Sequence, residues 1–318
     1  MRKSKRDRKR VSLYELLARF ATETDAMRHI ESLRWKNGRI CPRCGSNETR
    51  HASHKTMPYW CRPCRKYFSV KTGTLMEGSN IAYRKWMTGI HLLSTSLKGV
   101  SSYKLANDIG MHQSNAWFMA HRIRTAWANN ASELFGCQAE VDETCLGGKE
   151  KNRHQDKKLS AGRGAAGKTA AVGVKERDSR QIKSFKAADT KAVTPHRIVC
   201  DNVCQGATVR TDDATAYEGL QQHGCGHETV KHSAGEHVKG QAHANGTESF
   251  WSCPKRGYCG AYHEMSPRHL QKHVDEFSAR QNVREPDAMV QIDAAVCGLF
   301  GKRLKCADLI DGMDGTIH

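Results

Sequence analysis

Three acidic residues in the second half of the chain have the order and spacing of a metal site. Asp142 directly follows the predicted strand AEV at 139–141, Asp212 lies just after the predicted strand ATVR at 207–210, and Glu248 comes after thirty-five intervening residues. Carboxylates at strand ends gather at one edge of a sheet, where hard divalent cations find oxygen ligands. Three of them can hold two Mg²⁺ or Mn²⁺ ions roughly 4 Å apart, an arrangement suited to phosphoryl transfer. Since a single acid is more often a surface residue, the prediction rests on the set.

A basic residue follows the third acid at helical spacing. Lys255 comes seven positions after Glu248, so on a helix both residues face the same side, where Lys255 can pair with a phosphate. Pro254 lies between them, and proline removes the hydrogen bond to the carbonyl four residues back at a cost of about 3 kcal/mol or more inside a helix. We expect a helix that starts near Gly246 to bend or end at Pro254.

Four cysteines have the spacing of a zinc ribbon. They read CxxC, sixteen residues, CxxC, at Cys41, Cys44, Cys61 and Cys64. Two such knuckles present four thiolates to one Zn²⁺ in a tetrahedron. Reduced structural cysteines are the alternative. Because the segment has few apolar residues, we expect its folding to depend on the metal.

Residues 101–127 predict two helices joined by a tight turn at Gly110, the shape of a helix-turn-helix. The second helix of such a unit enters the major groove of DNA with its first residues near the base edges. Those residues are Gln113, Ser114 and Asn115, and we expect Arg122 or Arg124 to contact phosphates. An ordinary helical hairpin remains the alternative.

The overall charge favours a polyanionic partner. The formal net charge is +18 and the isoelectric point is near 9.5, well beyond what solubility requires. No window approaches the roughly 18 apolar residues of a membrane span, which predicts an intracellular protein with no membrane partner. Thirteen cysteines in such a chain indicate thiols or metal ligands, and not a disulfide framework.

The chain resembles transposases of the IS1595 family, with an ISXO2-like catalytic domain, from about residue 13 to residue 284. The resemblance rests on an ordered set of stretches: CPRCGS with YWCRPCRKYFSVKTGT, SYKLANDIGMHQSNAWFMAHRIR, EVDET with GGKEKNRH, GRGAAGKTAAVGV, VRTDDATAY, HANGTESFWS with KRG, and SPRHLQKHVDEFSAR. It implies a DNA transposase that binds terminal inverted repeats and catalyses Mg²⁺-dependent cleavage and strand transfer. It also implies a homodimer or larger assembly on double-stranded DNA in a prokaryotic cytoplasm, near the nucleoid, with no small-molecule substrate.

The resemblance assigns roles to individual residues. Asp142, Asp212 and Glu248 become the metal ligands, with Asn245 as the alternative third ligand because the family uses either Glu or Asn there. Lys255 matches the basic residue seven positions after the third acid. Where the family commonly has two leucines, this sequence has Cys253 and Pro254. A catalytically impaired DNA-binding protein, either a decayed transposase or a regulator, is therefore the alternative function.

Together these features predict a multidomain α+β protein. Its expected parts are a basic arm with short helices at 1–39, a zinc ribbon at 40–72, a helical DNA-binding region at 73–135, an RNase H-like α/β core at 136–285 and a tail without an assigned role at 286–318. Within the core, a basic, glycine-rich loop is expected either to clamp DNA or to remain solvated, and its first basic residues are Lys149, Lys151 and Arg153.

Overall fold

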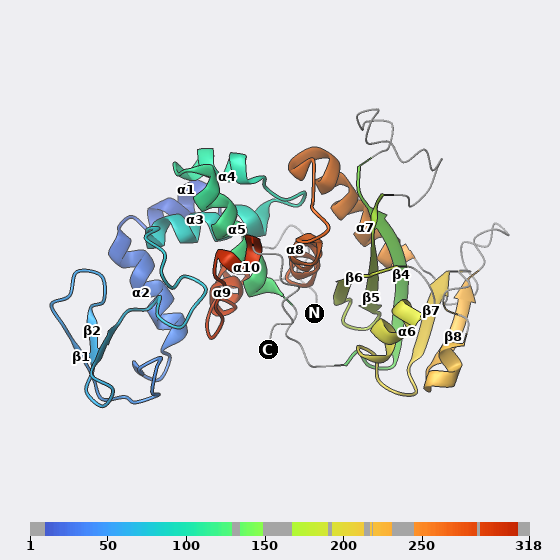
Figure 1. Ribbon diagram of the computed structural model, residues 1–318, viewed down its shortest axis with the longest axis horizontal. Coiled ribbons are helices and arrows are strands. Elements are labelled where there is room, and N and C mark those ends of the chain that lie inside the picture. The colour runs from blue at the N-terminus through green and yellow to red at the C-terminus, as the bar shows by residue number, and fades with distance from the viewer. Residues whose placement is uncertain are drawn as a thin grey trace. The chain divides into compact units, whose positions relative to one another are not determined.

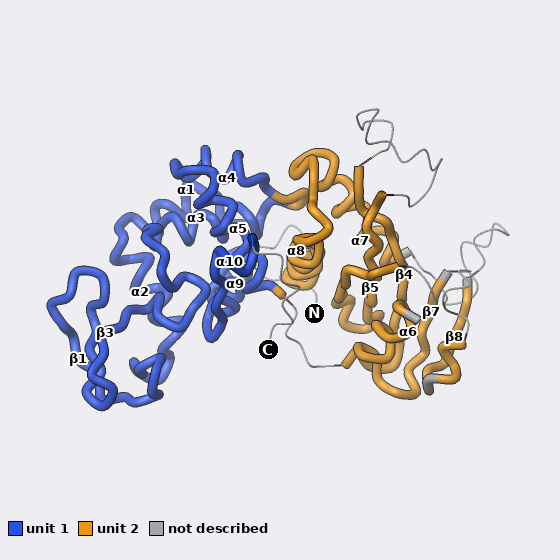
Figure 2. The backbone as a smooth tube through the Cα atoms, viewed as in Figure 1, with its two compact units in different colours: residues 1–96, 100–127, 285–318 blue, residues 97–99, 128–284 orange. Residues whose placement is uncertain are grey.

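The computed structural model describes residues 10–128, 134–148, 167–189, 193–212, 217, 219–230, 245–284 and 287–310. These residues form two compact units, one of residues 1–96, 100–127 and 285–318 and the other of residues 97–99 and 128–284 (Figure 2). The C-terminal segment, to which the sequence assigns no role, thus belongs with the N-terminal unit. No described helix has the length and apolar character needed to cross a membrane.

The first unit is mainly helical (Figure 1). Its described helices are α1 (Leu13–Arg19), α2 (Glu23–Arg34), α3 (Tyr83–Thr95), α4 (Ser102–Ile109), α5 (Gln113–Trp127), α9 (Ala288–Cys297) and α10 (Ala307–Ile310). The two short helices expected near the N-terminus are confirmed, and each begins with a capping box. Apolar residues of all seven helices share one core, to which α9 contributes Ile292 and Val296.

Helix α3 contributes Trp86, Met87, Ile90 and Leu93 to this core. Trp86, Ile90, Leu93 and Leu97 recur at helical spacing, which predicts that all four lie on one apolar face. The prediction is confirmed for the first three, whose side chains are fully buried. It was wrong for Leu97, because α3 ends at Thr95 and the Leu97 side chain is 66% exposed.

A small three-stranded antiparallel sheet lies between α2 and α3 in the sequence, formed by β1 (Thr49–His51), β2 (Tyr59–Cys61) and β3 (Lys66–Phe68). Its buried cluster consists of only Cys41, Tyr59, Cys61 and Phe68. A core of this size cannot hold such a segment by apolar burial alone, so a further constraint is needed. Phe68, the only phenylalanine of the ribbon, is fully buried in this cluster.

The second unit contains a five-stranded sheet of order β6-β5-β4-β7-β8. The strands are β4 (Gln138–Leu146), β5 (Thr169–Glu176), β6 (Ile182–Lys186), β7 (Thr208–Asp212) and β8 (Gly226–Val230). β4, β5 and β6 pair antiparallel, whereas β4, β7 and β8 pair parallel. The sequence has four short β-like runs, at 139–141, 169–174, 181–185 and 207–210, and they coincide with β4, β5, β6 and β7 to within one residue at their starts. No such run predicts β8.

Both faces of this sheet are covered. One face, with Val141, Val172 and Val209, packs against helix α6 (Val193–Cys200) and the 3₁₀ turn η4 (Leu220–His223). The other packs against α7 (Asn245–Gly257), the π-helical turn η6 (Tyr258–Tyr262) and α8 (Leu270–Asn282). The sequence also predicts a helix from about 267 to 281, and α8 occupies most of that range. Short alternating strands with two buried faces fit a sheet between two helical layers.

One close contact fixes α7 on its face of the sheet. The indole of Trp251, 1% exposed, lies on the backbone of Gly173 in β5. A Cβ at Gly173 would lie 2.9 Å from Cζ2 of that indole. Glycine is therefore the residue that allows Trp251 to pack at this depth.

We expect Gly173→Ala to destabilise the protein by about 1–3 kcal/mol, because the added methyl group overpacks a buried site that cannot easily yield. Urea unfolding of the full chain, followed by circular dichroism, measures the change. Gly260→Ala is the matched control, since a Cβ at Gly260 meets no atom within 4 Å. Equal stability of the two variants would contradict the packing of Trp251 against β5.

Candidate functional site

The four predicted zinc ligands come together in the ribbon. Their Sγ atoms all lie within 4.8 Å of one another, with 3.7 Å between Cys41 and Cys64 and 3.5 Å between Cys44 and Cys61. Four sulfur atoms placed tetrahedrally about 2.3 Å from a zinc ion are separated by roughly 3.8 Å. The geometry and the thiol donor set therefore both fit structural Zn²⁺.

The surroundings of Cys41 favour its thiolate. Burial raises the pKa of the Cys41 thiol, but N–H donors at Arg43 and Cys44 and the neighbouring thiols outweigh it and bring the pKa to about 7. Since the thiolate is the form that binds a metal, the ribbon loop prepares this ligand for the ion.

The helical hairpin has its turn where the sequence predicts it. Gly110 ends α4 in the left-handed conformation, with φ 68° and ψ 63°, and α5 begins at Gln113. The Lys85 ammonium donates a hydrogen bond of 2.6 Å to the Gly110 carbonyl, which ties the turn to α3. Ser114 and Asn115 are exposed at the start of α5. The half-buried Gln113 amide donates to the Ser102 hydroxyl at 2.8 Å.

The two arginines expected to contact phosphates are buried. Arg124 is 3% exposed and Arg122 is 7% exposed. The Arg122 guanidinium donates to the Glu77 carbonyl at 3.1 Å and lies over the Phe118 ring, 4.1 Å from its centroid. A contact with the DNA backbone along the outer surface of the hairpin requires an exposed cation, so this burial argues against that role for both residues.

The first two acids lie on neighbouring parallel strands. β4 and β7 pair in register from Gln138 with Thr208 to Glu140 with Arg210. The pairing ends there, and the same register extended by two residues would align Asp142 with Asp212, the last residue of β7. Asp142 is half-buried. The topology thus brings two positions that are seventy residues apart in sequence to neighbouring strands of the sheet.

Helix α7 begins against the same face of the sheet as Asp142. A Cβ at Gly246, in its first turn, would collide with the Glu140 carboxylate and with Lys175 Nζ. Side chains two residues apart on a strand share a face, so Asp142 points to the same face as Glu140. The first turn of α7 also carries Glu248, which is exposed.

Pro254 does not end α7. The helix runs from Asn245 to Gly257 and passes directly into the π-helical turn η6. Thr247, Phe250 and Pro254 are buried on the side that faces the sheet. Glu248 and Lys255, two turns apart, are both exposed. Of the two outcomes expected at Pro254, a bend or an end, the helix does not end there, and Glu248 and Lys255 lie on the same helix.

Sequence reasoning did not identify two contacts near these acids. The Tyr217 hydroxyl donates to the Glu143 carboxylate, which links the EVDET stretch to VRTDDATAY beside the buried core. Glu140, 6% exposed, pairs with Arg177 at 3.3 Å and lies opposite Lys175 on β5. Burial lowers the pKa of Lys175, while the charge of Glu140 opposes that shift. Glu140 and Lys175 are charged residues beside apolar strand residues, and this pattern could have indicated that they pair.

Several predicted residues lie outside the described part of the chain. Lys149, Lys151 and Arg153 belong to the segment 149–166, which is not described, and the same holds for the side chains of Asp212 and Asn245.

Comparisons with known proteins agree with both units. Residues 21–67 match the transposase zinc-ribbon domain, and residues 133–282 match the ISXO2-like transposase domain. The chain is 29% identical over 287 residues to a protein described as uncharacterized in the transposable element ISH50 of Halobacterium salinarum. That alignment covers 84% of this chain and 94% of the relative. The second domain match spans the five-stranded sheet with α7 and α8. With its zinc ribbon and its ISXO2-like domain, the chain belongs to the IS1595 family of transposases.

Proposed function

We propose that this protein is an active DNA transposase that binds the terminal inverted repeats of its element and catalyses Mg²⁺- or Mn²⁺-dependent cleavage and strand transfer. The observation that carries the proposal is the parallel pairing of β4, which contains Asp142, with β7, which ends at Asp212, together with helix α7, which carries Glu248. The family membership supports the same reaction. Three antiparallel strands followed by two parallel ones also fit an RNase H-like core.

Each residue of the proposed site has a distinct task. Asp142, Asp212 and Glu248 would hold the divalent ions, and their hard oxygen donors suit Mg²⁺. Asn245 is the alternative third ligand, because it begins the same helix. When bound, the ions supply activation of the attacking hydroxyl and stabilisation of the leaving oxygen. Lys255, exposed two turns beyond Glu248, would bind a phosphate of the DNA strand near the cleaved bond.

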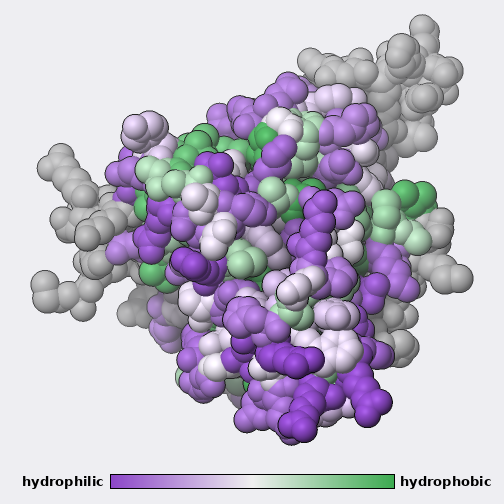
Figure 3. All heavy atoms as spheres, turned by 90° about the vertical axis from the view of Figure 1, so that its left-hand side faces the viewer, coloured by the Kyte–Doolittle hydropathy of each residue, from purple (hydrophilic) through white to green (hydrophobic). Residues whose placement is uncertain are grey.

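In this proposal the first unit binds the DNA ends. Ser114 and Asn115 are exposed where a recognition helix meets base edges. On the outer face of the ribbon, Arg50, Trp60 and Tyr67 pair across the three strands. The face of the molecule that contains the ribbon is dominated by hydrophilic side chains (Figure 3). Cations can bind the phosphates of a nucleic acid while neighbouring aromatic rings stack on its bases. Two copies of the protein would hold the two ends of an element.

We expect Asp142→Asn to abolish strand transfer and to leave binding of the DNA ends unchanged, because the amide keeps the shape and loses the charge that holds the cation. Strand transfer of a labelled terminal repeat with Mg²⁺ measures the first effect, and fluorescence anisotropy of the same duplex measures the second. Equal strand transfer by the variant and the native protein would refute the catalytic assignment.

We expect Pro254→Leu to change strand transfer by less than about twofold, since α7 already continues through Pro254 with Glu248 and Lys255 on the exposed side. The same strand-transfer assay, run beside the native chain, checks this. A gain of tenfold or more would mean that proline displaces the site, and it would favour an impaired DNA-binding protein over an active enzyme.

We expect Cys61→Ser to lose the zinc ion and to weaken binding of the DNA ends at least tenfold, because the ribbon has almost no apolar core of its own. Metal content per chain and anisotropy of the labelled duplex measure the two effects. Cys297→Ser is the matched control, because Cys297 is exposed and lies outside the thiol cluster. Full zinc content in Cys61→Ser would contradict the four-thiolate site.

A further inference from the structure

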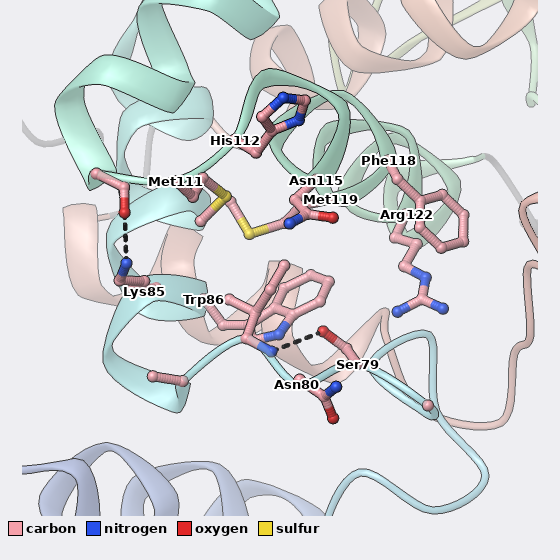
Figure 4. Close-up of a pocket in the computed structure, with 14 residues that line it drawn as sticks. Ser79, Asn80, Lys85, Trp86, Met111, His112, Asn115, Phe118, Met119 and Arg122 are labelled. Carbon is pink, nitrogen blue, oxygen red and sulfur yellow. Dashed lines mark hydrogen bonds between the residues drawn. The ribbon is translucent and has the colours of Figure 1, made fainter.

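The first unit contains a pocket beside the turn of the helical hairpin. Its volume is about 580 Å³, within the range of roughly 300–1,000 Å³ that is usual for small-molecule sites. One wall is formed by Asn115 and Arg122 of α5 with His112 just before the helix, and the opposite wall is the segment 78–82 with the first turn of α3 (Figure 4). The pocket therefore opens at the N-terminal end of the proposed recognition helix.

The most unusual group in this pocket is Arg122. The close-up shows its guanidinium pointing into the open space between Phe118 and Ser79 (Figure 4). The side chain is 7% exposed, its Nε has no hydrogen-bond partner among the described residues, and no described carboxylate forms an ion pair with it. Burial lowers the pKa of Arg122. A buried cation held by a single backbone carbonyl and an aromatic ring is costly, and a bound anion would offset that cost.

The other charged groups strengthen this preference for an anion. Lys85 also lines the pocket, where its ammonium holds the Gly110 carbonyl. The lining residues include no aspartate and no glutamate. The nearest acid in sequence, Glu77, accepts a hydrogen bond from Gly73 N at 3.0 Å and faces Arg303 at 3.9 Å. Its carboxylate is thus engaged elsewhere.

The remaining walls suit a planar aromatic group. The part-buried Met111 and Phe118 line the pocket with a thioether and a ring, which pack well against aromatic rings, and the fully buried Trp86 and Met119 lie behind them. The amides of Asn80 and Asn115 offer both donors and acceptors at the exposed margin. The Trp86 indole N–H is buried and has no hydrogen-bond partner in the described part of the chain. A phosphate alone would leave most of this volume and all of this apolar surface unused.

We propose that the pocket binds one nucleotide, with its phosphate at Arg122 and its base among the methionine and aromatic side chains. Two sources have this chemistry: a free mononucleotide, or a nucleotide turned out of the DNA duplex on the adjacent recognition helix. The second source rests on the proposed function. Extrusion of a base costs a few kcal/mol, which an aromatic-lined pocket can offset.

Titration with free mononucleotides tests the first source. The zinc-loaded full chain is titrated calorimetrically with dAMP, dTMP and inorganic phosphate. Asn80→Asp places a negative charge at the exposed margin of the pocket and is expected to weaken nucleotide binding about tenfold. Asn37→Asp makes the same charge change at an exposed position that does not line the pocket, and it should have no effect. Equal affinity for phosphate and mononucleotide, or equal affinity of the two variants, overturns the proposal.

A duplex of the terminal repeat with single 2-aminopurine substitutions tests the second source. Extrusion into the pocket is expected to change the fluorescence severalfold at one position, with the native chain and with Asn37→Asp, but not with Asn80→Asp. Fluorescence anisotropy of the same duplex shows whether the protein binds the DNA at all, and so distinguishes a failure of the pocket proposal from a failure of the proposed function. If the duplex is bound while no position responds and no mononucleotide binds, the pocket proposal is overturned and DNA binding stands. If the duplex is not bound at all, the proposed function fails first.

Discussion

The register between β4 and β7 is the constraint on which the proposed site depends. Extended by two residues, it aligns Asp142 with Asp212, and the alternation along β4 turns Glu140 and Asp142 toward α7 while Val141 faces the opposite core. A slip of one residue would exchange these two faces, so that the carboxylates would point into the apolar core around Val172 and Val141 would point toward α7. Burial of apolar residues such as Val141 therefore also determines the direction in which the neighbouring carboxylates point. Folding and the chemistry of the site are specified together.

Features with a local physical cause could be predicted from the sequence. The paired CxxC knuckles, the turn at Gly110, the two N-terminal helices and four of the five strands depend on spacing, on left-handed backbone conformation or on alternation within a few residues. The apolar face of α3 was also predictable up to Leu93, but not its end. For the site, the sequence supplied the candidate acids and their order, while the placement of Asp142 and Asp212 on neighbouring strands required the strand pairing.

The contacts that the sequence did not predict arise between distant segments. The burial of Arg122 depends on the loop that supplies the Glu77 carbonyl, and the need for Gly246 depends on the pair of Glu140 and Lys175 across β4 and β5. Neither is visible from periodicity along one element. At Pro254 local propensity predicted either a bend or an end, and the helix does not end there. Helix α7 continues past this residue, with one side buried against the sheet, and a π-helical turn follows Gly257.

The chain order of the two units has a consequence for how they are coupled. Since 285–318 returns to the first unit, the second unit is an insertion, and it is joined to its host by covalent connections on both its N-terminal and C-terminal sides. An inserted domain explores fewer orientations than one attached by a single linker, which raises its effective concentration near whatever the host unit holds. The host, in turn, is incomplete until α9 has been synthesised and supplies Ile292 and Val296 to the core. A nascent chain therefore finishes its helical unit only after the inserted unit has been synthesised.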